Sequence, residues 1–172
     1  GLSIMAFEVQ ASVADPNKTG VYFVHGATDL ETGDLYIRGA SKATIAGFGY
    51  TDKSSTPTVV DRKSTTIDFT KSGDKTKVLA SFGVDFSSLA SAVVVSVISA
   101  FRTPEDNAGS TDTLALLSVL EDGRVVKSPL IAGPQTSRIQ IIHNAPDPTL
   151  QVVDIYVNGV KTLDNFNFRK AS

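Results

Sequence analysis

The sequence of 172 residues contains no cysteine. This absence excludes disulfide bonds, metal sites built from thiolates and a cysteine nucleophile. No apolar run reaches the roughly 18 residues that a membrane-spanning helix needs, so no membrane insertion is expected. The formal net charge of −2 lacks the basic excess of a general nucleic-acid binder, so no nucleic-acid partner is expected either.

Motifs of the common enzyme classes are also missing. The sequence has neither the Gly-x-Ser-x-Gly of serine hydrolases nor the glycine-rich phosphate loops of nucleotide-binding proteins. We therefore expect a protein that is not an enzyme and that binds no cofactor. Its 41% hydrophobic and 20% charged residues are typical of an ordered globular chain.

Short segments rich in β-branched and aromatic residues alternate with polar turns. These segments are 19–25, 33–38, 58–62, 64–70, 76–82, 92–101, 113–120 and 124–129. Segment 92–101 is apolar on both faces, which predicts a central strand with Val93, Val95, Val97 or their neighbours in the core. A helical turn is expected only at 85–89. This pattern predicts an all-β fold, an antiparallel sandwich of about seven strands over residues 20–131.

One motif occurs twice at a domain-scale spacing. Each copy has a strand ending in His-x-Ala-x-Asp, then Asp-x-Tyr-x-x-Gly, then an aromatic pair. The members are His25, Asp29, Asp34, Tyr36, Gly39 and Phe48/Tyr50 in the first copy, and His143, Asp147, Asp154, Tyr156, Gly159 and Phe166/Phe168 in the second. A repeat of this length predicts tandem copies of one domain.

The repeat divides the chain into four parts. Residues 1–19 are expected to be the closing strand of a preceding copy and 20–133 a complete sandwich. Residues 134–137 form a linker, and 138–172 supply the opening strands of a following copy. Because a lone hairpin is marginal in water, both incomplete ends are expected to pack against other protein, most simply another copy head to tail. The competing arrangement folds the ends back onto the same chain.

The two motifs resemble the opening of the family called domain of unknown function 4397. Its members begin with a Val/Ile-rich strand ending in His-x-[Ser/Ala]-x-Asp, followed by Asp-[Val/Ile]-Tyr-[Val/Ile]-x-Gly, which residues 143–159 match. Residues 20–131 resemble a more divergent copy, in which residues 30–33 replace a proline-containing segment. The resemblance implies an immunoglobulin-like β-sandwich in a secreted or cell-surface bacterial protein, with no assigned activity.

The repeated histidines and aspartates are the best candidates for a functional site. His143, Asp147 and Asp154 could bind a metal ion or act as an acid–base pair. Two ligands in each copy make a poor metal site, however, and a structural part is expected to recur in every copy. We therefore interpret the motif residues as structural and predict no metal site. Each histidine is expected to bond to the aspartate or backbone of its own loop.

Two further groups of side chains have a functional interpretation. Glu105, Asp106, Asn107 and Asp112 could line a calcium loop, but their spacing does not match an EF-hand and favours a solvated loop. Tyr22, Tyr36, Tyr50 and Tyr156 could stack on sugars, although three of them lie in apolar strands.

The function expected from these observations is that of a non-catalytic structural or adhesive module in a tandem extracellular protein. Its partners would be other copies of itself. The alternative is a carbohydrate-binding module that recognises a surface polysaccharide. That alternative requires a row of exposed aromatic side chains on one sheet face.

Overall fold

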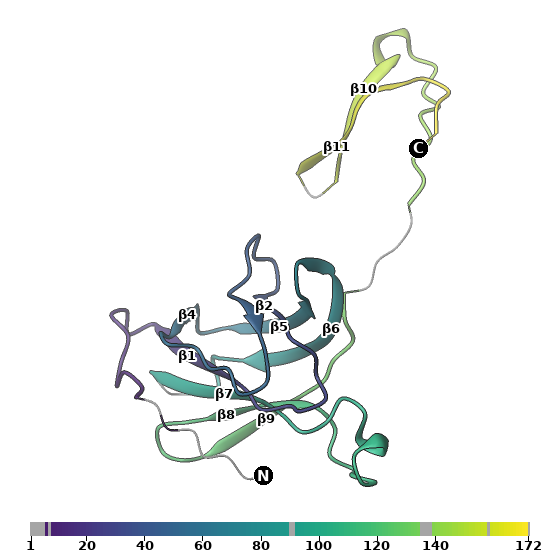
Figure 1. The fold of residues 1–172 in the computed structure, drawn as a ribbon. Coiled ribbons are helices and arrows are strands. Elements are labelled where there is room, and N and C mark those ends of the chain that lie inside the picture. Colours follow the sequence, from purple (N-terminus) through teal and green to yellow (C-terminus); the bar gives the residue numbers. More distant parts are fainter. Residues whose placement is uncertain (1–5, 7, 90–91, 135–138, 158, 172) are drawn as a thin grey trace. The chain divides into compact units, whose positions relative to one another are not determined.

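A computed structural model describes residues 6, 8–89, 92–134, 139–157 and 159–171. The chain divides into two compact units, Gly1–Pro134 and Gln135–Ser172 (Figure 1). They are called here the sandwich unit and the C-terminal unit. Among the described residues, no helix is both long and apolar enough to cross a membrane.

The described part of the sandwich unit consists of nine strands in two sheets. The strands are β1 (Lys18–His25), β2 (Gly33–Ile37), β3 (Ile45–Phe48), β4 (Thr58–Asp61), β5 (Ser64–Lys71), β6 (Asp74–Asp85), β7 (Val93–Ser99), β8 (Ala115–Val119) and β9 (Val125–Pro129). The sheet orders are β4-β1-β7-β8-β9 and β3-β2-β5-β6. The predicted all-β sandwich is confirmed. The strands exceed the expected seven, and the two shortest, β3 and β4, lie at sheet edges.

The pairing between β1 and β7 departs from the expected antiparallel pattern. These strands run parallel, with Val21 opposite Val94 and His25 opposite Ile98, whereas the other strand pairs are antiparallel. A parallel pair needs a long crossover, and here β2 to β6 form that connection. Of these strands, β2, β3, β5 and β6 make up the second sheet, and β4 returns to the first sheet beside β1. The two sheets are thereby linked around one core.

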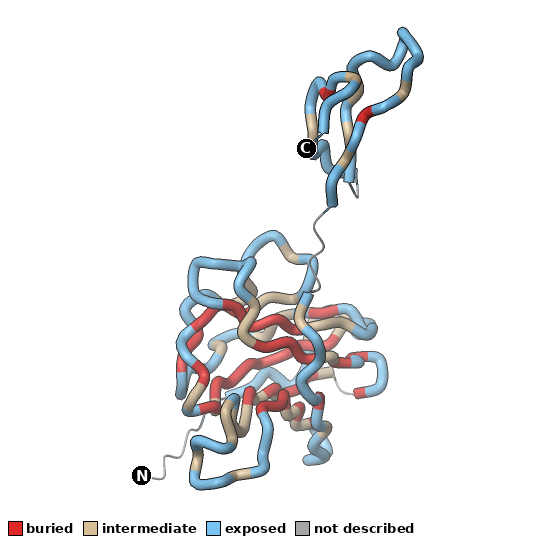
Figure 2. The backbone as a smooth tube through the Cα atoms, turned by 90° about the vertical axis from the view of Figure 1, so that its right-hand side faces the viewer, coloured by how far each residue is buried: buried red, intermediate tan, exposed pale blue. Residues whose placement is uncertain are grey.

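Alternation along the strands decides which side chains enter the core. Val94 and Ile98 of β7 are buried between the sheets, together with Phe23, Phe69 and other aromatic and aliphatic side chains. Val95 and Val97 point to the opposite face and are half-buried. The expected core strand is therefore confirmed through the neighbours of Val95 and Val97. Figure 2 shows the buried residues concentrated on the facing strands.

The N-terminal segment lies against its own sandwich unit. The Gln10 amide donates to the Tyr22 hydroxyl at 3.1 Å, and a side chain at Gly20 would meet Val13 Cγ1 at 2.6 Å. A closing strand is expected within residues 1–19, but residues 6 and 8–17 do not belong to a strand, and residues 1–5 and 7 lie outside the described residues. Tyr22 and Gly20 belong to the outer face of β1. The segment therefore crosses a sheet face instead of extending a sheet edge.

The helical turn predicted at 85–89 is a hydrogen-bonded turn without a helix. The Asp85 carboxylate accepts from the Ser87 amide at 3.1 Å, which closes the turn locally. Two short 3₁₀ helices occur elsewhere, η1 (Pro104–Asp106) and η2 (Pro148–Leu150). Each begins with a proline, whose fixed φ suits the first helical position.

The C-terminal unit is a single antiparallel hairpin with a preceding loop. Strands β10 (Val152–Val157) and β11 (Val160–Asn167) pair across a turn in which Gly159 has a φ of 80°. Of the described residues in this unit, only His143 and Phe166 are buried. Many of its apolar side chains are exposed, and within the described part of this unit no second sheet packs on the hairpin.

Candidate functional site

His25 lies at the end of β1, in the core of the sandwich unit. It is 0% exposed, and neither ring nitrogen has a hydrogen-bond partner among the described residues. The rings of Phe48 and Phe69 contact it edge-on, with centroid distances of 5.6 and 5.4 Å. Burial lowers the pKa of His25, against the opposing charge of Asp52. The expectation that His25 bonds to its own loop is therefore wrong, because aromatic rings surround it.

His143 occupies the corresponding place in the C-terminal unit. Its Nε2 is hydrogen-bonded to the Leu150 carbonyl of its own loop, as the sequence predicted. Phe166 and Phe168 pack beside the ring, with centroid distances of 6.2 and 6.0 Å. The imidazole is 7% exposed. Both histidines thus pack against the first aromatic residue of the pair that follows them in the motif, Phe48 or Phe166. The second ring is Phe168 of the same pair beside His143, but Phe69 of β5 beside His25.

The backbone around each histidine makes the same two hydrogen bonds. In each case the histidine amide donates to a carbonyl beyond the aromatic pair, and an amide from that segment donates back. The pairs are His25–Asp52 and Thr51–His25 (both 2.9 Å), and His143–Lys170 and Arg169–His143 (3.1 and 2.8 Å). One adjacent antiparallel bridge is also repeated, as Val24–Lys53 and Ile142–Ala171. The repeated sequence therefore specifies a repeated local structure.

A carboxylate anchors the turn before the aromatic pair in both copies. Asp34 accepts from the Gly47 amide at 2.8 Å, and Asp154 accepts from the Asn165 amide at 3.0 Å. Gly47 and Asn165 both have positive φ, 62° and 52°. Sequence reasoning missed this pair, although glycine and asparagine are the residues that adopt such a conformation most readily.

The two anchoring carboxylates differ in their remaining contacts. Asp34 is buried and also accepts from the Gly73 amide at 2.9 Å. Hydrogen bonds from Gly47 and then Gly73 lower its pKa. Asp154 is exposed and pairs with Lys161 Nζ at 2.7 Å, which, together with the Asn165 amide, lowers its pKa to about 2. Both carboxylates stay ionised at neutral pH and are occupied by donors within the protein.

Replacing Asp34 with alanine is expected to lower the free energy of unfolding by about 1–3 kcal/mol, because the Gly47 and Gly73 amides lose their acceptor. Urea unfolding followed by circular dichroism measures this change. Asp112→Ala is the matched control, since Asp112 is exposed, and its effect should stay within roughly 0.5 kcal/mol. Equal stabilities of the two variants would contradict the anchoring role.

The aspartate of the His-x-Ala-x-Asp element differs between the copies. Asp29 accepts from the amides of Arg102 and Thr103, both at 2.9 Å, and so ties its loop to the β7–β8 connection. Burial acts to raise its pKa, but these hydrogen bonds outweigh it and the pKa is lowered. Asp147 instead caps η2 by accepting from the Thr149 amide at 2.8 Å. Neither aspartate contacts its histidine in the described structure.

The Tyr and Gly of the motif have matching surroundings in the two copies. Lys75 Nζ lies 5.4 Å from the Tyr36 ring centroid, and Lys161 Nζ lies 6.0 Å from that of Tyr156. Gly39 and Gly159 both have positive φ, 94° and 80°. The tyrosines are half-buried and exposed, respectively. The two glycines shape turns, and the two tyrosines cover strand faces. Among the described residues, these positions bring no reactive groups together.

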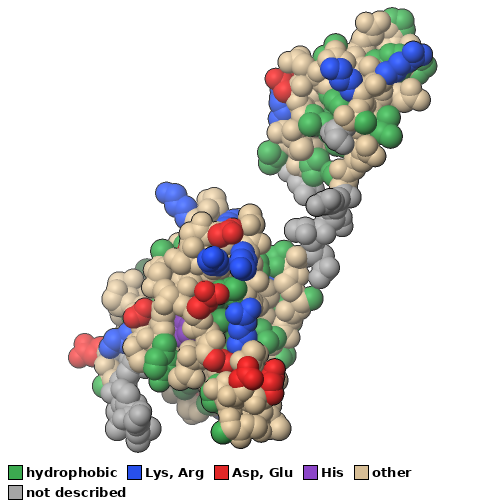
Figure 3. Space-filling view, turned by 45° about the vertical axis from the view of Figure 1, so that its right-hand side comes forward, with side chains coloured by type: hydrophobic (Ala, Val, Ile, Leu, Met, Phe, Trp, Pro, Cys, Tyr) green, Lys and Arg blue, Asp and Glu red, His purple; other side chains and the backbone are tan. Residues whose placement is uncertain are grey.

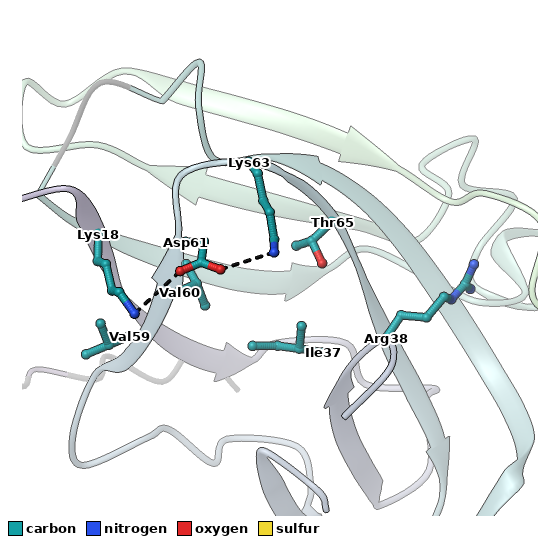
Figure 4. Close-up of a pocket in the computed structure, with 8 residues that line it drawn as sticks. All are labelled: Lys18, Ile37, Arg38, Val59, Val60, Asp61, Lys63 and Thr65. Atoms are coloured by element: carbon teal, nitrogen blue, oxygen red, sulfur yellow. Dashed lines mark ion pairs between the residues drawn. The ribbon is translucent and has the colours of Figure 1, made fainter. Parts of the chain in front are cut away.

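A cleft lies between β4 and the ends of β2 and β5 (Figure 4). It has a volume of about 330 Å³ and is lined by Lys18, Asp61, Lys63 and several apolar side chains. Asp61 pairs with Lys63 at 3.1 Å and with Lys18 at 3.4 Å, and the lysines, Lys63 foremost, lower its pKa. The charges are largely satisfied by each other, and this cleft contains no residue of the repeated motif.

Among the described residues, the outer face of the four-stranded sheet combines a charged pair with one aromatic ring, that of Tyr36. Arg38 forms two hydrogen bonds to Asp68, at 2.7 and 2.8 Å, and Tyr36 lies on the neighbouring position of β2. Tyr50 and Tyr156 are the exposed tyrosines among the described residues, and they lie in different units. The described structure therefore contains no row of exposed aromatic side chains.

The acidic loop also holds no cation site in the described structure. Within Glu105, Asp106, Asn107 and Asp112, only the Asn107 side chain has a structural contact, donating to the Thr103 carbonyl at 2.9 Å and to Asp29. No group of three or more His, Asp or Glu side chains among the described residues is arranged to hold a metal ion. Figure 3 shows acidic and basic side chains interspersed over one face of the sandwich unit.

Comparison with known proteins adds no relative. No family model matches the sequence, and no curated protein or solved structure matches it significantly.

Proposed function

We propose that the chain is a non-catalytic structural module of a tandem, extracellular β-sandwich protein, acting in adhesion through contacts between sandwich copies. The observation that carries this proposal is the repeated histidine–aspartate motif, which makes the same backbone hydrogen bonds in both units. In the proposal each unit begins an immunoglobulin-like sandwich of the kind that resemblance to domain of unknown function 4397 implies.

The contacts of the motif residues support a structural role. His25 is enclosed by aromatic rings, and Asp29, Asp34, Asp147 and Asp154 are all occupied by amide donors. A catalytic group needs access to a substrate, and the fully buried imidazole of His25 has none. The geometry that the two copies share accordingly serves folding.

A segment exchange within the chain tests the proposal. Residues 141–171 replace residues 23–53, with Val153→Gly in the inserted segment because the sandwich has Gly33 at that place. If the C-terminal unit begins the same sandwich, the chimera should fold with a β-rich circular dichroism spectrum and a single unfolding transition. The control carries Asp154→Ala in the inserted segment and should be less stable. An unfolded chimera beside a folded wild type would contradict the proposal.

The alternative function is a carbohydrate-binding module, for which Tyr36, Arg38 and Asp68 offer one polar sheet face. Titration of the whole chain with acidic and neutral polysaccharides separates the two functions. Binding that is lost in Tyr36→Ala, with unfolding unchanged, would favour the alternative. The structural proposal expects no saturable binding.

A further inference from the structure

The imidazole of His25 is enclosed where three strands of the sandwich unit meet. Phe48 of β3 and Phe69 of β5 pack edge-on against it, and Ile98 of β7 lies opposite His25 in the pairing of β1 with β7. All four residues are at most 2% exposed, and neither ring nitrogen has a partner among the described residues. Burying a polar group without a hydrogen bond is costly, and burying it with a charge costs far more. Protonation of His25 therefore requires that one of these strands move away.

The charged groups around His25 do not offset this cost. Asp52 attracts the protonated imidazole, but Asp52 is exposed and its carboxylate already accepts from the Gly49 amide at 2.8 Å. The carboxylates of Asp34 on β2 and Asp68 on β5 are occupied by other donors. Strands β3 and β7 contain no charged residue. Burial thus outweighs the attraction of Asp52, and the pKa of His25 lies below 6.5.

Of the three strands that enclose the imidazole, β3 is the least firmly held. It is a four-residue edge strand, and its register with β2 has two pairs, Gly33–Phe48 and Leu35–Ile45, with an irregularity between them. Strands β5 and β7 are each paired on both sides. Segments with few pairs open more readily than the centre of a sheet. Residues 45–53, called here the edge segment, are therefore expected to open first.

The edge segment also contains backbone strain. Thr51 has a φ of 73°, in the left-handed region that β-branched residues rarely adopt. It is the third residue of a turn closed by the Asp52 amide, which donates to the Gly49 carbonyl at 2.9 Å, and this position with positive φ favours glycine or asparagine. The equivalent residue of the C-terminal unit, Arg169, has a φ of 62°. Opening relieves this strain, so the closed edge segment is less stable than its hydrogen bonds alone would make it.

We propose that the edge segment is a pH-sensitive switch, which opens when His25 takes up a proton while the other strands of the sandwich unit stay paired. Opening exposes the imidazole and leaves one edge of β2 unpaired. The closed state keeps the imidazole neutral, whereas the open state binds a proton with the ordinary pKa of histidine, so acid favours opening below pH 6.5. The switch belongs to the sandwich unit and does not depend on the proposed function in adhesion.

Hydrogen exchange of the intact chain at pH 6.5 and 4.5 tests the switch through the Thr51 amide, which donates to the His25 carbonyl. Its protection, relative to an unstructured amide at the same pH, is expected to fall by up to about 100-fold. The control is the Leu120 amide, which donates to the Arg124 carbonyl beside β8 and β9 and should keep its protection. Asp34 titrates below 3.8, outside this range. Unchanged protection of Thr51, or protection equal to that of β7 amides at both pH values, would overturn the proposal.

Two variants separate the proton from the strain. His25→Phe has no proton to gain, so the protection of Thr51 should no longer depend on pH. Thr51→Gly suits the positive φ and should raise the protection of the His25 amide roughly 2- to 10-fold at both pH values, with its pH dependence retained. Ala46→Gly, on the same segment but without a positive φ, is the matched control and should not raise it. Equal pH dependence in His25→Phe and the wild type, or lower protection in Thr51→Gly, would overturn the proposal.

Discussion

Replacing Gly33 with alanine is expected to lower the free energy of unfolding by about 3 kcal/mol, the upper range for overpacking a core. The added Cβ would lie 2.2 Å from the Thr70 carbonyl oxygen and 2.5 Å from Phe69 Cε1. Neither atom can move away easily, because Thr70 is backbone-paired to β2 and Phe69 is fully buried. The close approach of β5 to β2 therefore requires glycine.

Gly83→Ala on β6 is the matched control for this substitution. The nearest atom to its added Cβ is Ile131 Cγ2 at 3.4 Å, an ordinary contact. We expect a change within roughly 1 kcal/mol, measured by urea unfolding under the same conditions. Similar losses for Gly33→Ala and Gly83→Ala would show that β5 does not press on Gly33.

Acidification from pH 7 to 4.5 is expected to destabilise the sandwich unit through His25. Burial places the folded-state pKa of His25 below its unfolded value of 6.5. Below pH 6.5 the unfolded chain therefore binds a proton that the folded chain does not. Stability should fall with decreasing pH from 6.5 down to the folded-state pKa, with a slope of up to about 1.4 kcal/mol per pH unit.

The carboxylates act in a separate pH window. The pKa values of Asp29, Asp34 and Asp68 are lowered from 3.8, so their contribution to stability is present above that value and is lost only as the pH falls below it. Between pH 6.5 and 4.5 they remain mostly ionised in both states, because this range lies above 3.8. Of these three aspartates and His25, the His25 imidazole therefore causes most of the fall in stability between pH 6.5 and 4.5.

His25→Phe isolates this effect. Phenylalanine keeps a ring between Phe48 and Phe69 and removes the two nitrogens that lack hydrogen bonds. Thermal unfolding at pH 7 and 4.5 should show a smaller difference for His25→Phe than for the wild type. If thermal stability changed equally between pH 7 and 4.5 in His25→Phe and in the wild type, groups other than His25 would cause the acid sensitivity. Tight zinc or calcium binding by the wild type that is lost in His25→Phe would contradict the structural role of this residue.

Local pattern was enough to predict most strands and the repeated motif. Alternation and turn residues place the strands to within a few residues, since these signals act over short stretches of chain. The parallel pairing of β1 with β7 could not be predicted in this way, because all four strands of the second sheet lie between these two strands in the chain. Nor does any local signal show that residues near Gln10 lie on the outer face of β1.

The motif residues show the same division between local and distant contacts. The bond of His143 to Leu150 lies within one loop and was predictable. Asp29 instead reaches Thr103, 74 residues away, so it is not available to His25. The anchoring of Gly47 by Asp34 depends on a positive φ, which the glycine alone suggests only weakly. Comparing the two copies strengthens this signal, since Asn165 stands at the equivalent position.

The central claim is that the C-terminal unit repeats the local structure of β1 to β3. Hydrogen exchange of the intact chain, followed residue by residue by NMR, tests it through four amides: His25, Thr51, His143 and Arg169. All four donate to backbone carbonyls in the repeated pairing, so each should exchange more slowly than an unstructured amide. Protection of His25 and Thr51 alone, with His143 and Arg169 exchanging at unstructured rates, would contradict the claim.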